Sequence, residues 1–251
     1  MRTKPVSLAI DANQPIADLI VRYPQLLSPL MVMGIKPALG NSTLNDHCQG
    51  RSIGVELCTD LLELLVNPDY QPKGQVRYNL LPLTGYYCKL QQGLRPWLNV
   101  LKHHLQHFTE SADSQPVITL CTNFTKNLED HIAEQAEFVP NVLNRLYELF
   151  YSPVFTAEDE HILTDAQTII SKGQGNLFAD ELDDIVSLLL RHTKVSDNET
   201  AYCAAIYQLN QLRSSINYIR QIRTKLLHPM VSDMVRTIRR RCTATTKNEQ
   251  P

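Results

Sequence analysis

An arginine interrupts the apolar face of the long amphipathic segment that we expect to be helical over residues 196–239. Apolar side chains recur there in alternating three- and four-residue steps, as on a buried helix face: Tyr202, Ala205, Leu209, Leu212, Ile216, Ile219, Leu226 and Met230. Position 223 falls on the same face, where a guanidinium group is costly unless an acid pairs with it. This placement therefore predicts that Arg223 forms an interior ion pair with Glu134 or Glu137. The alternative is a side chain that reaches solvent past Leu226.

Polar residues also interrupt the apolar face of the segment that we expect to be helical over residues 116–151. His131 and Gln135 are four residues apart and share a helix face, with Glu134 beside them. Imidazole and carboxylate groups bind iron and zinc, so His131, Glu134 and Gln135 are the candidate metal ligands. A neutral amide is a poor ligand, which favours a hydrogen-bonded interior cluster without metal.

Three histidines near residue 105 resemble a metal site less closely than His131, Glu134 and Gln135 do. His103 and His107 have the four-residue spacing of zinc-binding helices, with His104 between them. No H-E-x-x-H motif is present and no third ligand is in register, so we do not expect a metal there. The sequence also contains no phosphate-binding loop, nucleophile elbow or paired acid–base motif, and it therefore predicts no catalytic residue.

Composition and charge restrict the class of protein. The chain has 251 residues, of which 43% are hydrophobic and 20% charged, as in a globular protein with one sizeable core and a small domain. The formal net charge of −2 gives no general basic surface for nucleic acid. The basic cluster close to the C-terminus is interpreted as the cationic end of a helix: Arg236, Arg239, Arg240 and Arg241.

The expected cellular location of the protein and the expected state of its cysteines both follow from features that the sequence lacks. No apolar run has the length of a signal peptide, and none approaches the roughly 18 residues of a membrane helix, so we expect a cytoplasmic protein with no membrane partner. The six cysteines are scattered, with no C-x-x-C pair, which argues against a disulfide framework or a zinc knuckle.

The periodicity throughout is helical, which predicts the all-α class. Turn-forming residues at positions 67–74 mark the best domain boundary. We expect a small helical domain over residues 1–72, a four-helix bundle over 76–242 and a disordered tail over 243–251. The bundle segments are expected at 79–108 with a bend at Pro96, at 116–151, at 157–192 with an interruption at 172–175, and at 196–239.

The N-terminal segment resembles a known family. Residues 17–27 (ADLIVRYPQLL), 33–35 (MGI) and 40–48 (GNSTLNDHC) are similar to the small first domain of repair-of-iron-centres (ScdA-type) proteins. The nearest resemblance is to the Bacteroidetes version, in which this domain precedes a hemerythrin-like bundle. The family's paired cysteines are absent, and Cys48 is the only thiol of the matching segment. We therefore expect this domain to dock a partner rather than perform redox chemistry.

Residues 76–240 resemble hemerythrin-like domains, which bind non-haem di-iron through histidines and His-x-x-x-Glu pairs. The endings of two predicted helices match the family, as Phe-Val-Pro at 138–140 and Leu-Leu-His-Pro at 226–229. The resemblance assigns ancestral ligand positions to Gly85, Ile219 and Arg223, each of which has been substituted. On the second helix it gives either Asp130 with Glu134 or, from the apolar face, His131 with Gln135.

The resemblance leads to two expected functions. The favoured one is a non-catalytic regulatory or interaction protein, derived from an iron-binding stress-response protein whose di-iron site has been lost. We then expect no bound cofactor and an unidentified protein partner, with a homodimer left open and nucleic acid not expected. The alternative is an iron-binding protein for oxygen or nitric oxide sensing or for iron–sulfur cluster repair, with non-haem iron as its cofactor.

Overall fold

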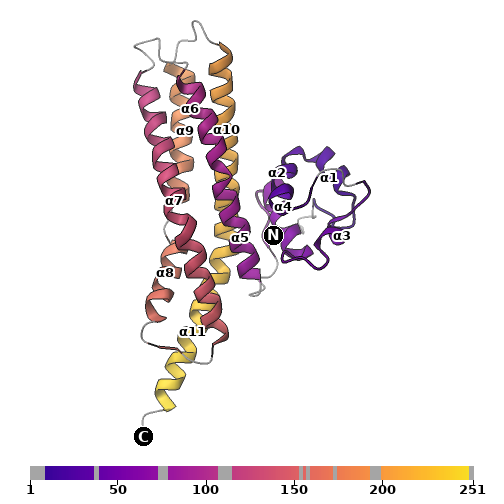
Figure 1. Ribbon diagram of the computed structural model, residues 1–251, viewed down its shortest axis with the longest axis vertical. Coiled ribbons are helices and arrows are strands. Elements are labelled where there is room, and N and C mark those ends of the chain that lie inside the picture. The colour runs from indigo at the N-terminus through magenta and orange to yellow at the C-terminus, as the bar shows by residue number, and fades with distance from the viewer. Residues whose placement is uncertain are drawn as a thin grey trace, which may run out of the picture. The chain divides into compact units, whose positions relative to one another are not determined.

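The computed structural model describes residues 9–36, 40–72, 79–106, 115–152, 155–156, 159–171, 174–192 and 199–248. Within these ranges the chain is helical, and extended pairing is limited to one isolated bridge between Pro15 and Thr43. The all-α class is therefore confirmed. In chain order the elements are α1 (Ile16–Arg22), the 3-10 helix η1 (Pro24–Leu26), α2 (Leu27–Val32), α3 (Leu44–Cys48), α4 (Val55–Val66), α5 (Leu80–Gln92), α6 (Leu94–Gln106), α7 (Gln115–Tyr151), α8 (Glu160–Ser171), α9 (Gln174–His192), α10 (Glu199–Ile222), the π-helix η4 (Arg223–Leu227) and α11 (His228–Asn248) (Figure 1).

The chain divides into two compact units, and both are discontinuous in sequence. One contains residues 1–87, 140–170 and 221–251, and the other contains residues 88–139 and 171–220. This division does not follow the boundary expected at residues 67–74. The reason is that the long helices pass from one unit into the other.

Residues 10–66 share one hydrophobic core. The buried members come from all four of its α-helices, η1 and the intervening loops: Ile10, Ile16, Leu19, Leu26, Leu30, Ile35, Leu44, Cys48, Cys58 and Leu62. Two turns fix the path between the helices. Gly34 follows the last residue of α2 and its C-cap Met33, and its φ of 83° is a backbone conformation that favours glycine. Thr43 and Asp46 form a reciprocal capping box that starts α3.

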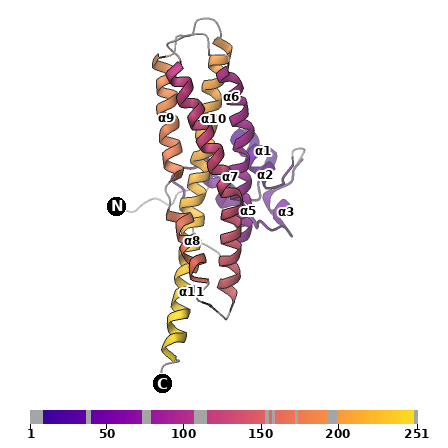
Figure 2. The same ribbon diagram turned by 60° about the vertical axis from the view of Figure 1, so that its left-hand side comes forward.

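The second unit consists mainly of four helices that lie side by side in both views, namely α6, the first part of α7, α9 and α10 (Figures 1 and 2). The rings of Phe124 on α7 and Phe178 on α9 meet edge to face, with their centroids 6.0 Å apart. Ion pairs at the surface join α6 to α7 and α9 to α10. Apolar side chains fill the interior of this unit, as expected for a helical bundle.

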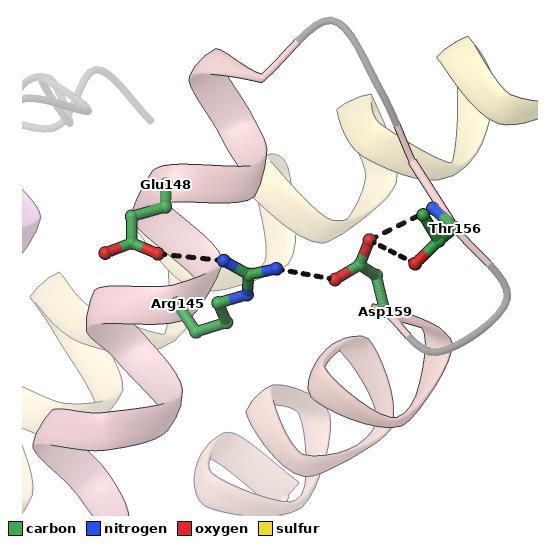
Figure 3. A network of polar contacts seen from close by, with 4 residues as sticks. All are labelled: Arg145, Glu148, Thr156 and Asp159. Carbon is green, nitrogen blue, oxygen red and sulfur yellow. Dashed lines mark hydrogen bonds and ion pairs between the residues drawn. The ribbon is translucent and has the colours of Figure 1, made fainter.

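In the first unit, polar contacts connect the end of α7 to α8. Arg145 on α7 binds Glu148 one turn ahead and reaches Asp159, just before α8, with an N–O distance of 3.1 Å to each (Figure 3). Asp159 in turn accepts hydrogen bonds from the backbone amide and the hydroxyl of Thr156. Arg239 on α11 binds Glu160, so α8 is also connected to the C-terminal helix.

The helices begin and end close to the predicted positions, with two differences. The first long segment breaks at Gly93 and not at Pro96, because Pro96 lies in the first turn of α6, where a proline removes no helical hydrogen bond. A side chain at Gly93 would meet the carbonyl oxygens of Lys89 and Leu90 at 3.3 and 3.2 Å. The second difference is that α11 continues to Asn248, so helix covers residues 243–248 of the expected tail; residues 249–251 lie outside the described part.

Candidate functional site

The candidate ligands on α7 do not converge in the interior. Glu134 is exposed, and His131 and Gln135 are half-buried. The interior positions of this stretch are instead occupied by Leu128, Ile132 and Val139. The His131 ring lies 5.3 Å, between centroids, from the half-buried Phe178 ring. The apolar face of α7 therefore passes through Ile132, one residue from the predicted position.

The ancestral ligand positions on α5 and α10 carry side chains that cannot bind metal. Gly85 is exposed, and a Cβ added to it would meet no atom within 4 Å, so position 85 faces solvent. Ile219 is buried and apolar. Across the described ranges, no group of three or more His, Cys, Asp or Glu side chains is placed to hold a metal ion. His103 is exposed and His104 half-buried, whereas His107 lies outside the described residues.

A π-helix explains the position of Arg223. The segment Arg223–Leu227 is wound as a π-helix, and the His228 amide donates a hydrogen bond to the Arg223 carbonyl five residues earlier. A π-turn adds one residue to the helical repeat, so counting at the α-helical period across it gives the wrong face. Ile222 occupies the fully buried position, and Arg223 is half-buried. Glu134 and Glu137 are both exposed, and the interior ion pair of either acid with Arg223 stays a prediction.

The stability of an Arg223→Ala variant tests whether Arg223 forms an interior ion pair. We expect its free energy of unfolding to fall by about 1 kcal/mol or less, because a guanidinium still in contact with water gains little from charge interactions. Urea denaturation measures the difference. Thr224→Ala, at an exposed position of the same turn, controls for changes to the backbone. A loss of about 3 kcal/mol or more, as for a broken buried pair, would support the interior ion pair instead.

Sulfur-containing side chains that lie far apart in the sequence come together in the segment with the shared core, residues 10–66, which we call the small domain. Cys48 ends α3 and Cys58 lies in the first turn of α4, and both line the same cavity. Met33, directly after α2, places its Sδ 3.4 Å from the Cys58 Sγ. Cys48 is 8% exposed and Cys58 is fully buried. Cys48 is the only thiol of the segment that resembles the family, and Cys58, which lies outside that segment, is the second thiol beside it.

A cavity of about 170 Å³ adjoins these sulfur atoms. Its wall is formed by Met33, Ile35, His47, Cys48, Arg51, Ser52, Ile53 and Cys58. The Nε2 atom of His47 is buried and has no hydrogen-bond partner among the described residues. The Arg51 guanidinium is held by the Gly34 carbonyl oxygen at 3.1 Å. We call Met33, His47, Cys48 and Cys58 the sulfur cluster.

The two thiols of the sulfur cluster differ in acidity. The hydrogen bond from Cys58 lowers the pKa of Cys48; burial opposes this effect, and the positive charge of Arg51 adds to it. The same hydrogen bond, together with burial, raises the pKa of Cys58. Cys48 is therefore the thiol that ionises first. The ten-residue separation of the two cysteines matches no short motif, so sequence spacing alone could not identify the pair.

The C-terminal arginines contact the protein itself. Arg236 binds Asp233, Arg239 binds Glu160, and Arg241 donates to the Phe150 carbonyl oxygen at 2.6 Å while its guanidinium stacks on the Phe150 ring. All of these arginines lie in α11, as the interpretation of the cluster as part of a helix predicts.

Within the described ranges, none of the helices combines the length and the apolar character needed to cross a membrane. Comparison of the chain with protein-family models, with curated proteins and with solved structures finds no match.

Proposed function

We propose that the protein is a non-catalytic interaction protein with a hemerythrin-like bundle that no longer holds a di-iron centre. One observation carries the proposal: three of the positions that the family resemblance assigns to ligands are apolar or face solvent. Ile219 is buried, Gly85 is exposed, and Glu134 points away from the interior. A bundle-core metal site requires inward-facing ligands from several helices.

The order of the elements supports the proposed relation to the family. A small helical domain with its own core precedes four long helical segments, which are α5 with α6, α7, α8 with α9, and α10 with α11. The family has the same order of a small helical domain followed by a bundle. The resemblance itself depends on the matching residues at 17–27, 33–35 and 40–48 and on the two helix endings.

Exposed apolar side chains on the small domain support a docking role. Val21 on α1 is 84% exposed, and Met31 on α2 is 54% exposed. Leu27 lies one turn before Met31 on α2 and is also exposed. Exposed large apolar side chains are typical components of surfaces that bind protein partners.

The metal content of the purified protein tests this proposal. We expect protein purified without chelators from iron-supplemented cells to contain far less than one iron atom per chain, because the inward-facing positions carry no ligands. Elemental analysis measures the content. Ferrous iron added without oxygen should leave the melting temperature unchanged, since a ligand stabilises only the fold that binds it. About two iron atoms per chain, with an oxo-bridge absorption band, would contradict the proposal and favour the iron-sensing or cluster-repair alternative.

A further inference from the structure

A groove of about 360 Å³ lies between α8 and α11, which are neighbours in both views (Figures 1 and 2). All of the side chains that line it belong to the first compact unit. The side chains from α11 stand at positions i, i+3, i+4, i+7 and i+8, which form one face of a helix: Ser232, Val235, Arg236, Arg239 and Arg240. The α8 side consists of Gln167 and Ile170, which are three residues apart. We call this cavity the arginine groove.

The arginine groove has an apolar floor and a polar rim. Val235 is 2% exposed and Ile170 is half-buried, so these two side chains form the floor. The rim is formed by the guanidinium groups together with the hydroxyl of Ser232 and the amide of Gln167. Apolar surface combined with a few convergent polar groups is typical of sites that bind small molecules.

Two of the three guanidinium groups in the groove are held by acids that do not line it. The Arg236 Nη2 lies 2.9 Å from the Asp233 Oδ1, and the Arg239 Nη2 lies 3.0 Å from the Glu160 Oε1. A guanidinium carries five N–H donors, so an acid that contacts one nitrogen orients the group and leaves it donors for a ligand. Donors that are already oriented lose less entropy when a ligand binds.

We propose that the arginine groove binds a phosphorylated small organic molecule, with its phosphate on the three arginines and its apolar body over Val235 and Ile170. A volume of about 360 Å³ falls within the range of roughly 300–1,000 Å³ that is usual for small-molecule pockets. The proposal is independent of the loss of iron and of the docking role of the small domain, because it concerns other residues.

The charges at the groove select a phosphate. A phosphate monoester carries about −1.5 to −2 charges at pH 7 and three acceptor oxygens. Arginine binds such a group through pairs of parallel hydrogen bonds, and several arginines suit its charge better than they suit the single charge of a carboxylate. Among the described residues that line the groove there is no Asp or Glu, so no acid there repels the ligand.

The size of the charged region favours a small molecule over a nucleic acid. Nucleic acids are held through many phosphates along their length, which requires an extended basic surface. The formal net charge of this chain is −2, and its arginine side chains on this face of α11 converge on one groove.

Calorimetry with phenyl phosphate tests the proposal on the full-length chain. This probe joins a phosphate to an apolar ring and so presents both halves of the proposed ligand. We expect one binding site per chain in a phosphate-free buffer of low ionic strength, because salt screens exposed charges. Inorganic phosphate should bind more weakly because it lacks the ring. Phenol should show no saturable binding because it lacks the charge.

Variants of single arginines locate the site. Arg236 and Arg240 are exposed, so Arg236→Gln and Arg240→Gln should both fold, which circular dichroism verifies. We expect each to weaken the binding of phenyl phosphate about tenfold, a usual cost of losing a hydrogen bond to a charged group. Arg241→Gln is the matched control: it removes the same charge from the next residue of α11, which does not line the groove, and it should leave the affinity unchanged.

Four results would overturn the proposal. The first is that the wild type shows no saturable binding of phenyl phosphate, and the second is that folded Arg236→Gln and Arg240→Gln bind it as tightly as the wild type. An equal loss in Arg241→Gln would mean that the general charge of α11 attracts the anion. Equal affinities for inorganic phosphate and phenyl phosphate would leave the apolar floor without a role. A duplex oligonucleotide that binds more tightly than phenyl phosphate, and that Arg240→Gln releases, would replace the proposal with a nucleic-acid surface.

Discussion

Glu63→Ala is expected to lower the free energy of unfolding by about 2–5 kcal/mol, a larger loss than we expect for Asp159→Ala or Arg223→Ala. Glu63 lies on α4, is fully buried, and accepts a hydrogen bond from the Ile10 amide at 2.6 Å. Alanine would leave that amide buried without an acceptor and would open a cavity in the core of the small domain. Urea denaturation followed by circular dichroism measures the loss.

The Glu63→Gln variant separates the hydrogen bond from the charge. Burial raises the pKa of Glu63 above its ordinary value of 4.5, although the amides of Ile10 and Ala9 donate to the carboxylate and oppose the rise. The folded protein therefore holds this proton more tightly than the unfolded chain, and stability falls as the pH rises from 4.5 through the folded pKa. We expect Glu63→Gln to lack this decline and to be more stable than Glu63→Ala. Equal stabilities, with pH profiles parallel to the wild type, would contradict this explanation.

Asp159→Ala is expected to cost about 1.5–3 kcal/mol, because one carboxylate receives several charge-assisted hydrogen bonds. The side chain is only 9% exposed; it accepts from the Thr156 amide at 3.0 Å and from its hydroxyl at 2.8 Å, and it pairs with Arg145 (Figure 3). Loss of Asp159 would release the start of α8 from the end of α7. Thermal denaturation at neutral pH measures the difference.

The pH dependence of Asp159 has the opposite sign to that of Glu63. Hydrogen bonds from the Thr156 amide and hydroxyl, followed by the contact with Arg145, lower the pKa of Asp159 below its ordinary value of 3.8. The stabilisation of the fold by Asp159 is therefore complete above pH 3.8 and is lost as the pH falls through the pKa of Asp159 in the folded protein. Glu148→Ala removes the exposed partner of Arg145 and should change stability by no more than about 0.5 kcal/mol. Equal losses for Glu148→Ala and Asp159→Ala would mean that the network in Figure 3 acts only through Arg145.

Local signals predicted the helices well because they act over a few residues. The apolar period correctly predicts one helix over residues 116–151, which is α7, Gln115–Tyr151. Pro96 was misleading because the effect of a proline depends on its position in the helix, and Gly93 had already ended α5.

The candidate sites were harder to predict, because they depend on helix phase and on distant contacts. The one-residue shift at Arg223 arises from a π-turn, which side-chain periodicity does not reveal. On α7 the apolar face was assigned to His131 when Ile132 carries it, since neighbouring positions differ by only about 100° around a helix. The sulfur cluster joins residues of three segments, and no spacing rule connects Met33 to Cys58.

α7 is one continuous helix that both compact units share, which affects how the chain folds and how recombination can exchange its parts. Its 37 residues, about 55 Å of helix, pass from one compact unit into the other at residues 139–140. α5 and α10 also pass from one unit into the other, at residues 87–88 and 220–221. Unfolding of either unit therefore interrupts helices that also belong to the other, and we expect the two units to unfold in one cooperative transition. No single cut in the gene separates the units, so recombination exchanges them together or not at all.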